Sequence, residues 1–535
     1  MSAVAFARPP ARFRPPRFRL ARALRLEIRH SPVVWALPVL AALFYVNTYG
    51  TAAGLPPTWA NPASVITGTM LVYICVFAAG LAAWVGTREG RRKTGDLLAT
   101  TARAAWARQA TVFAATAFWM VLAFLAETAV LFIQTGRQAT WGGPPLWPVA
   151  VGVVGIVTAC AIGFTAGTLF PGRFTAPIVA VAVFVFEFIG FKSADNTYDF
   201  RGAGDSTYAL LQPAQGLPRP LEAGVFYHVP PDVAIAQVMF MGGILLLLVG
   251  LLGLSPAARV PGVRGLSFGS SSFSSLATAG RLLAACLVVS GVAGCVTAYS
   301  LAGTGRYTDA TGWVIPALHD AASDRPVPYT PDCTGTGFRV CIHPAYRGYL
   351  GAVAAALEPV GAEVAGLPGA PVRAELAVGD ALPAAVGTTS VYAYSGGGEE
   401  MVGSWLAVTP AEATTAAWEQ GVQQAFFVWF VSDSPTVALM NGTLTPAQQA
   451  VADALLAKVG SPALQLAPPQ KAGDGPPAGA SASGSSSGAA SAASLGQIAA
   501  AARRFGSLSP AARHAWLAGH VAGLRSGTIT LARVP

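Results

Sequence analysis

Charged residues are scarce in this chain of 535 residues. Asp, Glu, Lys and Arg together make up 11% of it, less than half of the roughly 25% usual in soluble domains. This scarcity excludes a disordered chain, which combines high charge with low hydrophobicity, and an ordinary soluble domain. Apolar residues make up 53%, and the mean hydropathy is +0.51. The composition therefore predicts a protein whose main solvent is lipid.

The net charge of +9 is distributed unevenly along the chain. Residues 1–302 carry 22 basic and 10 acidic side chains, whereas residues 303–535 carry 12 and 15. A nucleic-acid-binding protein would gather its basic residues on a soluble face, so no nucleic-acid partner is expected. The asymmetry instead indicates a protein of the lipid bilayer that retains positive charge in the cytoplasm.

Long apolar stretches predict seven membrane spans, because about 20 apolar residues cross a hydrocarbon core. The predicted spans are residues 31–49, 64–86, 110–134, 148–170, 174–191, 234–254 and 282–301. Between the fourth and fifth spans, Pro171-Gly172-Arg173 indicates a tight turn, with one long kinked helix as the alternative.

The positions of Arg and Lys predict the orientation, since both resist translocation near a span. Eight arginines precede the first span, and six basic residues lie between the second and third spans. The opposite loops together hold four. We therefore expect a multi-pass protein of the plasma membrane with a cytoplasmic N-terminus. Seven crossings would then place everything after residue 301 outside the cell.

Only six cysteines are present, and four of them lie within predicted spans. The other two, Cys333 and Cys341, flank a short loop in the part predicted to lie outside, where disulfides persist. We expect a disulfide here. Two free thiols are the alternative, and a metal site with His343 is a weaker one, since a fourth ligand is lacking.

Two segments predicted to be cytoplasmic have the pattern of amphipathic helices. Residues 18–29 place four arginines on one face and leucine and isoleucine on another. This pattern predicts either a helix in the inner headgroup layer or a basic segment that only fixes the orientation of the chain in the membrane.

In the inner loop, residues 87–108, Asp96 can cap a short helix with Leu98, Ala102 and Trp106 on one face. This apolar ridge, rimmed by arginines, suits a groove on a partner. The alternative is a solvated basic turn that only enforces orientation.

Catalytic motifs are lacking. Lys93-Thr94 has Arg92 where a phosphate-binding loop requires glycine, and neither a zinc-binding helix motif nor a nucleophile elbow occurs. We therefore expect no catalytic residue, metal or cofactor in this chain. If ATP drives its function, another polypeptide must bind the ATP.

These features make residues 1–254 similar to the permease subunit of type-2 ABC exporters. Members have a cytoplasmic amphipathic helix, six spans, a coupling helix after span two and an outer loop before span six. The pattern Arg88-Glu89-Gly90, followed by Thr94-Gly95-Asp96-Leu97-Leu98-Ala99-Thr100-Thr101, is similar to the family's inner loop.

The resemblance implies an ATP-binding subunit and a second permease copy or paralogue as partners. It assigns coupling to the ATPase to Glu89, Asp96, Leu97, Leu98, Ala102 and Trp106. The seventh span and the large outer part depart from the family.

Two acids, Glu127 and Glu187, fall well inside predicted spans. A carboxyl in lipid is costly unless it faces protein or water, so both are candidates for a transport pathway. Glu187 lies five positions before Lys192 in the sequence. For Glu187 we therefore slightly favour a structural hydrogen bond over a role in the pathway. Glu127 is the better pathway candidate.

The fold class expected is an α-helical polytopic membrane protein, with a six-helix permease core and one further transmembrane helix, carrying a C-terminal extracytoplasmic α+β domain. Predicted helices there are residues 345–367, 410–431, 446–459 and 510–524, and predicted strands are 389–395 and 405–409. The domain boundaries expected are 1–30 (basic segment), 31–254 (permease core), 255–281 (cytoplasmic linker), 282–301 (seventh helix), 302–466 (outer domain), 467–495 (flexible linker) and 496–535 (helical tail).

The resemblance thus implies the permease subunit of an ATP-driven ABC exporter. The alternatives are a membrane-anchored extracytoplasmic enzyme and a ligand-sensing or assembly protein. A mere anchor needs only one span, which favours the first.

Overall fold

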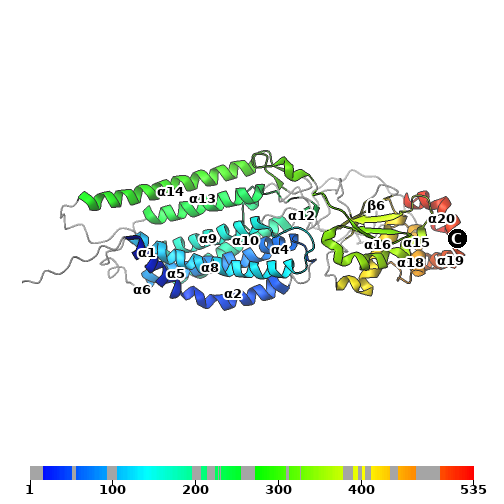
Figure 1. Ribbon diagram of the computed structural model, residues 1–535, viewed down its shortest axis with the longest axis horizontal. Helices are drawn as coiled ribbons and strands as arrows, with labels where there is room; N and C mark the ends of the chain where they lie inside the picture. The colour runs from blue at the N-terminus through cyan, green and yellow to red at the C-terminus, as the bar shows by residue number, and fades with distance from the viewer. Residues whose placement is uncertain are drawn as a thin grey trace, which may run out of the picture.

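The computed structural model describes most of the chain and divides it into two parts. The described residues are 16–50, 56–92, 105–195, 207–213, 223–226, 228, 230–254, 271–308, 313–325, 327–376, 390–395, 400–403, 411–433, 444–464 and 495–535. The C-terminal region, residues 313–535, begins with a segment, 313–325, that packs on the end of the bundle of long helices, and it continues along the longest axis into a part that contains a small sheet (Figure 1).

The bundle is built from helices of mostly apolar sequence. The first helical run consists of α1 (Pro16–Arg29), a 3-10 turn (Pro32–Ala36), α2 (Leu37–Phe44) and a π-helical turn (Tyr45–Tyr49). The second consists of α4 (Ala60–Val65), a π-helical turn (Ile66–Met70), α5 (Leu71–Gly86) and α6 (Arg88–Arg92). The remaining long helices are α8 (Ala105–Gly136), α9 (Leu146–Leu169), α10 (Thr175–Asp195), α13 (Asp232–Leu254) and α14 (Ser271–Gly303).

Six of these helical runs are long and apolar enough to cross a membrane. They are Ala21–Tyr49, Ala60–Arg92, Trp106–Gly136, Leu146–Leu169, Asp232–Leu254 and Gly280–Gly303. The predicted fifth span corresponds to α10, whose apolar described part, Thr175–Glu187, is shorter than these six. The helices thus indicate a multi-pass membrane protein.

A tight turn separates α9 from α10, as predicted, so the alternative of one kinked helix is wrong. The Thr175 hydroxyl donates to the Phe170 carbonyl oxygen at 2.5 Å, and this bond ties the two sides of the turn together. From the turn, α10 packs back along α5 and α9 and reaches the short helix α11 (Thr207–Leu210). A second short helix, α12 (Ala223–Phe226), precedes α13.

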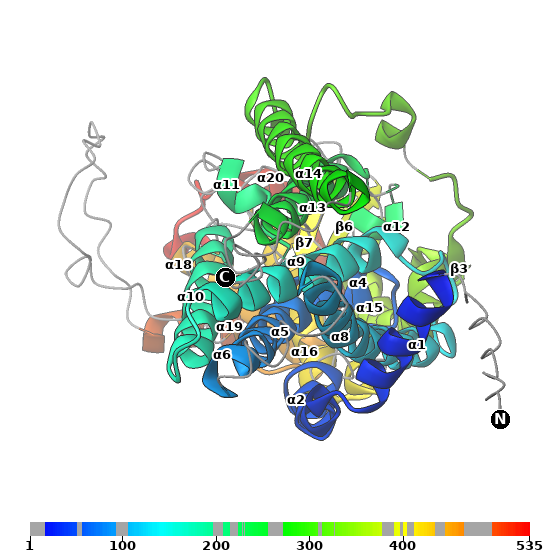
Figure 2. The same cartoon turned by 90° about the vertical axis from the view of Figure 1, so that its left-hand side faces the viewer.

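Glycines allow the helices to pack closely. A Cβ on Gly163 of α9 would lie 1.9 Å from the Ala79 carbonyl oxygen of α5, and one on Gly167 would lie 2.3 Å from that of Ala83. Backbone therefore packs directly on backbone at this interface. α14 packs on α13 in the same way, through Gly243 and Gly250, and lies at the rim of the bundle (Figure 2).

The sheet of the C-terminal region has five strands in sequential order. They are β3 (Asp332–Thr334), β4 (Arg339–Ile342), β5 (Arg373–Leu376), β6 (Ser390–Ser395) and β7 (Glu400–Gly403). β4 and β5 are parallel, with Val340 opposite Ala374, and the other pairs are antiparallel. Two short strands, β1 (Tyr307–Thr308) and β2 (Trp313–Val314), pair separately. A strand was predicted at residues 389–395, where β6 occurs, whereas β3, β4, β5 and β7 were not anticipated.

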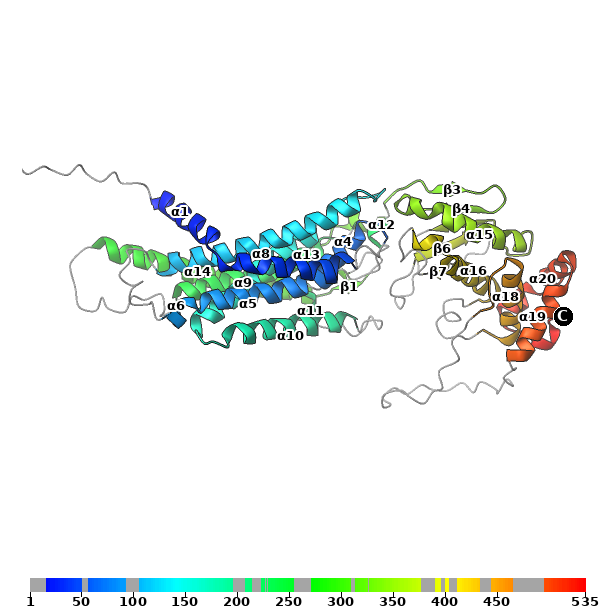
Figure 3. The same ribbon diagram turned by 90° about the horizontal axis from the view of Figure 1, so that it is seen from below.

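Helices cover the sheet and form one apolar core with it. α15 (Leu350–Val364) connects β4 to β5 after a 3-10 turn, α16 (Ala416–Val431) packs on α15, and α18 (Pro446–Lys458) packs on α16 (Figure 3). Residues 425–431 of α16 are all buried, as expected of an apolar run too short to span a membrane. α16 begins six residues later than predicted, because the Thr415 side chain caps it by accepting from the Trp418 N–H. The predicted strand 405–409 lies outside the described residues.

The tail packs onto this core. α19 (Leu495–Ser507) contacts α18, and α20 (Pro510–Arg525), a predicted helix, is capped by the Ser509 side chain, which accepts from the Ala512 N–H. The Arg513 Nε donates to Glu363 of α15 at 2.9 Å, which ties α20 to the region. The predicted flexible linker, 467–495, lies almost wholly outside the described residues.

Candidate functional site

The ends of the inner loop are joined by a bidentate ion pair. The Arg108 Nε on α8 lies 2.9 Å from Glu89 Oε1 on α6, and Arg108 Nη2 lies 3.4 Å from Oε2. Two parallel bonds fix the orientation of both groups better than a single contact does. Of the six coupling residues inferred from the resemblance, Asp96, Leu97, Leu98 and Ala102 lie outside the described residues. The structure thus places Glu89 at the base of this loop.

Trp106 lies in the first turn of α8 and contacts α13. A Cβ on Gly253 would lie 3.3 Å from the Trp106 indole nitrogen, so the absence of a side chain there leaves room for the ring. Trp106 is 37% exposed. Its ring therefore packs against α13 on one side and is open to solvent on the other.

Glu127 is the centre of a polar chain inside the bundle. Its side chain on α8 is buried and accepts a hydrogen bond from the Tyr73 hydroxyl on α5 at 3.1 Å. The Tyr73 oxygen accepts in turn from the Thr48 hydroxyl at 3.4 Å. Thr48 belongs to the π-helical turn Tyr45–Tyr49, which contacts the second π-helical turn of the bundle. Such turns are frequent at functional sites.

Sequence reasoning found Glu127 but missed Tyr73 and Thr48. A hydroxyl is inexpensive in a span, so neither residue is conspicuous by composition. Their role comes from their position near a buried carboxyl. That position can be recognised only when it is known which helices are neighbours.

Glu187 occupies a different interface. It is buried on α10 and lies close enough to the Cys75 thiol of α5 to interact with it electrostatically. Among the described residues its Oε2 atom has no hydrogen-bond partner. The side chain of Lys192, its expected partner, lies outside the described residues. The two acids are therefore not brought into one site with each other.

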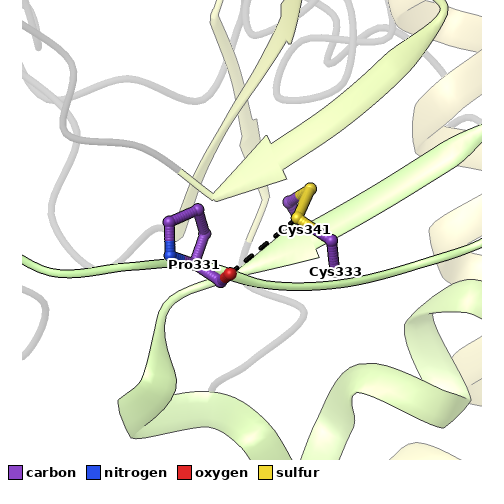
Figure 4. The surroundings of a disulfide bond; sticks show 3 residues. All are labelled: Pro331, Cys333 and Cys341. Carbon is purple, nitrogen blue, oxygen red and sulfur yellow. Dashed lines mark hydrogen bonds between the residues drawn. A yellow bond between two sulfur atoms is a disulfide. The ribbon is translucent and has the colours of Figure 1, made fainter.

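Cys333 and Cys341 form the predicted disulfide, with sulfurs 2.04 Å apart (Figure 4). They face each other in the β3–β4 hairpin, whose tip contains Gly335 at φ 91°. The alternatives of free thiols and of a metal site with His343 are therefore wrong. Across the described part of the chain, no group of three or more His, Cys, Asp and Glu side chains could hold a metal ion.

His343 lies buried where the C-terminal region meets the bundle. Its ring contacts Trp141 from the α8–α9 loop, Phe226 of α12 and Tyr329, at centroid distances of 5.0, 5.0 and 4.2 Å. Beside it, the Thr140 hydroxyl donates to the Pro344 carbonyl oxygen at 2.5 Å. Burial lowers the pKa of His343 to about 4, against the opposing effect of the Asp332 charge. The imidazole is therefore neutral at pH 7, and its Nδ1 accepts from the Ala345 N–H.

A second contact at this junction is ionic. His319 bridges two carboxylates: its Nδ1 lies 3.0 Å from Asp232 Oδ2 and its Nε2 lies 2.9 Å from Asp324 Oδ1. Burial opposes the charged imidazolium, but the two hydrogen bonds and carboxylate charges outweigh it and raise the pKa of His319. Asp232, the first residue of α13, is fully buried and also accepts from the Ile315 N–H at 3.1 Å.

No protein-family model, curated protein or solved structure matches this chain. Its function must therefore be inferred from the chemistry of its own residues. Three groups of residues are available for that: the Glu89–Arg108 pair with Trp106, the chain from Thr48 to Glu127, and the contacts of His319 and His343 at the junction.

Proposed function

We propose that the chain is the membrane-spanning permease subunit of an ATP-driven ABC exporter, energised by a separate ATPase subunit that binds its inner loop. The observation that carries the proposal is the Glu89–Arg108 ion pair. It ties the two ends of the inner loop together at the end of α5 and the start of α8. A force applied to this loop by a partner would therefore act on two spanning helices, and through Trp106 on a third.

The orientation proposed is a cytoplasmic N-terminus and an extracytoplasmic C-terminal region. In its support, α1 and α6 lie at the end of the bundle opposite to the C-terminal region (Figures 1 and 3). α10 has 21 residues, and at 1.5 Å per residue it is about 30 Å long, enough to act as the fifth of seven crossings. The disulfide suits an oxidising compartment.

The polar chain from Thr48 to Glu127 is proposed as part of the pathway, and the permease is proposed to work with a second copy or paralogue. A carboxyl held by hydroxyls among apolar helices can attract a cationic or hydrogen-bond-donating part of a substrate. The two π-helical turns beside it support a local change of helix geometry during transport.

The coupling assignment is tested by solubilising the full-length protein mildly and assaying the copurified material for ATP hydrolysis. We expect activity with the wild-type chain and its loss in Leu98→Asp/Trp106→Asp, because two carboxylates disrupt an apolar contact surface. Leu26→Asp, on an exposed leucine of α1, is the matched control and should retain activity. Equal recovery from the double variant would contradict the proposal.

The pathway assignment is tested with Glu127→Ala and Tyr73→Phe. Both should leave recovery of the ATPase intact, since neither residue lies near the inner loop. Glu127→Ala should lower ATP turnover in reconstituted vesicles more than Tyr73→Phe, which removes one hydrogen bond and keeps the carboxyl. Unchanged turnover in Glu127→Ala would remove this carboxyl from the pathway.

A further inference from the structure

A basic cavity opens at the end of the bundle that carries α1 and α6. Its volume is about 360 Å³, and its lining residues are His30, Pro32, Trp84, Val85, Arg88, Arg91 and Arg92. Three arginines and no acid line it. A cavity of this charge attracts an anion.

Two of the arginines are available to bind a ligand, and the third is held in position. The Arg91 Nη2 donates to the Trp84 carbonyl oxygen at 3.2 Å, and its guanidinium lies 5.7 Å from the Trp84 ring centroid. Within the part of the chain that the structure describes, Arg88 and Arg92 make no ion pair. The neighbouring carboxylate, Glu89, is paired with Arg108. Among the described residues, these two guanidiniums thus have no carboxylate counter-ion on the side of the cavity.

The aromatic residues indicate the depth of the cavity in a membrane. Trp84 is 42% exposed, and Trp35, on the 3-10 turn that begins at Pro32, is 84% exposed. Exposed tryptophans at the ends of spanning helices lie at the level of the lipid headgroups. Val39, one turn deeper, is also exposed, at 49%. The cavity therefore opens where headgroup phosphates lie, beside a surface that suits acyl chains.

We propose that this cavity binds the phosphate of an anionic phospholipid headgroup in the inner leaflet. Arg88 and Arg92 donate to the phosphate oxygens, Arg91 adds positive charge, and Trp84 packs against the glycerol and upper acyl carbons. An adjoining cavity shares Val85, Arg88 and Arg92 with this one and is also lined by Glu27 and Glu89, so its charge is mixed and an anion is favoured on the side of Arg91. The proposed site does not depend on an ATPase partner.

The test is native mass spectrometry of the full-length protein released from nanodiscs that contain phosphatidylglycerol and phosphatidylcholine in equal amounts. We expect retained phosphatidylglycerol in the wild-type protein. In Arg91→Gln/Arg92→Gln its occupancy should correspond to a dissociation constant at least about tenfold higher, because Arg92 loses a charge-assisted hydrogen bond to the phosphate. Arg91→Lys/Arg92→Lys keeps the charge and should retain most of the binding.

The control removes the same charge elsewhere at this end of the bundle, in Arg22→Gln/Arg281→Gln, and should leave the dissociation constant unchanged. Equal loss in both pairs would overturn the proposal, because it would reflect general surface charge. Absence of any preference for phosphatidylglycerol would overturn it as well. Full displacement of the lipid by millimolar inorganic phosphate would assign the cavity to free anions instead of a lipid. Size-exclusion chromatography confirms that each variant is folded.

Discussion

Replacing His319 with glutamine should loosen the contact between the N-terminal end of α13 and the C-terminal region. His319 holds Asp232 and Asp324 at 3.0 and 2.9 Å. Glutamine can reach one carboxylate with a neutral donor but cannot supply a positive charge between two. The substitution therefore leaves Asp232 buried with the Ile315 N–H as its remaining donor among the described residues.

The expected magnitude follows from the difference in exposure of the two acids. Asp232 is 0% exposed, and removing one member of a buried ion pair costs about 3 kcal/mol or more, because the other charge is left uncompensated. Asp324 is 44% exposed, so its pair contributes less than about 1 kcal/mol. We therefore expect a loss of about 3 kcal/mol in His319→Gln and a much smaller one in Asp324→Asn.

The direction of the pH dependence follows from the raised pKa of His319. The ion pairs stabilise the fold fully below pH 6.5, the ordinary pKa of histidine, where the imidazole is protonated in both states. The stabilisation is lost as the pH rises through the raised pKa. The junction should therefore weaken in mildly alkaline solution.

Hydrogen exchange at the Ile315 amide, which donates to Asp232, measures this contact directly. After correction for intrinsic exchange rates, protection should fall as the pH rises in the wild-type protein and should be low throughout in His319→Gln. His514→Gln, which alters another partly buried histidine of the C-terminal region, is the control. Protection that is independent of pH, or equal in His319→Gln and the wild type, would refute the ion-pair reasoning.

Three further predictions concern stability and are measured by thermal or denaturant unfolding. Changing Cys333 and Cys341 to serine opens a loop with a sequence separation of 8 and should cost about 2.5 kcal/mol by the chain-entropy estimate; an unaltered midpoint would contradict it. Gly163→Ala should destabilise the bundle by about 1–3 kcal/mol, because the added Cβ would overlap a carbonyl oxygen. Gly242→Ala is the control and should not destabilise it, because the space around Gly242 is open. Equal effects of the two substitutions would be evidence against backbone contact at Gly163. Lowering the pH from 6.5 toward 4 should destabilise the junction around His343 by up to about 3 kcal/mol. The pKa of His343 is lowered in the folded protein, so the unfolded chain binds a proton more readily in this range. A variant His343→Phe should lose this pH dependence.

The sequence was sufficient to predict features that depend on local chemistry. Apolar length identified the helices of the bundle, because crossing lipid requires about 20 apolar residues whatever the fold. Pro171-Gly172 identified the α9–α10 turn, and the two cysteines identified the hairpin disulfide. Each of these inferences needs only neighbours in the chain.

Features that depend on distant contacts were not predicted. Tyr73, the hydrogen-bond partner of Glu127, lies 54 positions away in the chain, and Thr48, which donates to Tyr73, lies 79 positions from Glu127. Neither can be recognised without knowing how the helices pack. Asp232 and His319 are separated by 87 positions, and each alone resembles an ordinary loop residue. Strands β3, β4 and β5 are three or four residues long, too short for alternation to distinguish them from loop.

α13 connects the two ends of the molecule by direct contacts. Near its C-terminal end, Gly253 packs against Trp106 beside the inner loop, and its first residue, Asp232, bonds to His319 and Ile315 of the C-terminal region. Because a continuous helix is stiff along its axis, a displacement of α13 at its Gly253 end would reach the junction at Asp232 with little attenuation. In the proposed exporter, the C-terminal region would then respond to the state of the ATPase through this helix, and the two ends would be energetically coupled in both directions. A double-mutant cycle between Trp106→Ala and His319→Gln, read out as copurified ATP hydrolysis, distinguishes such coupling from two independent contacts, which would give additive losses.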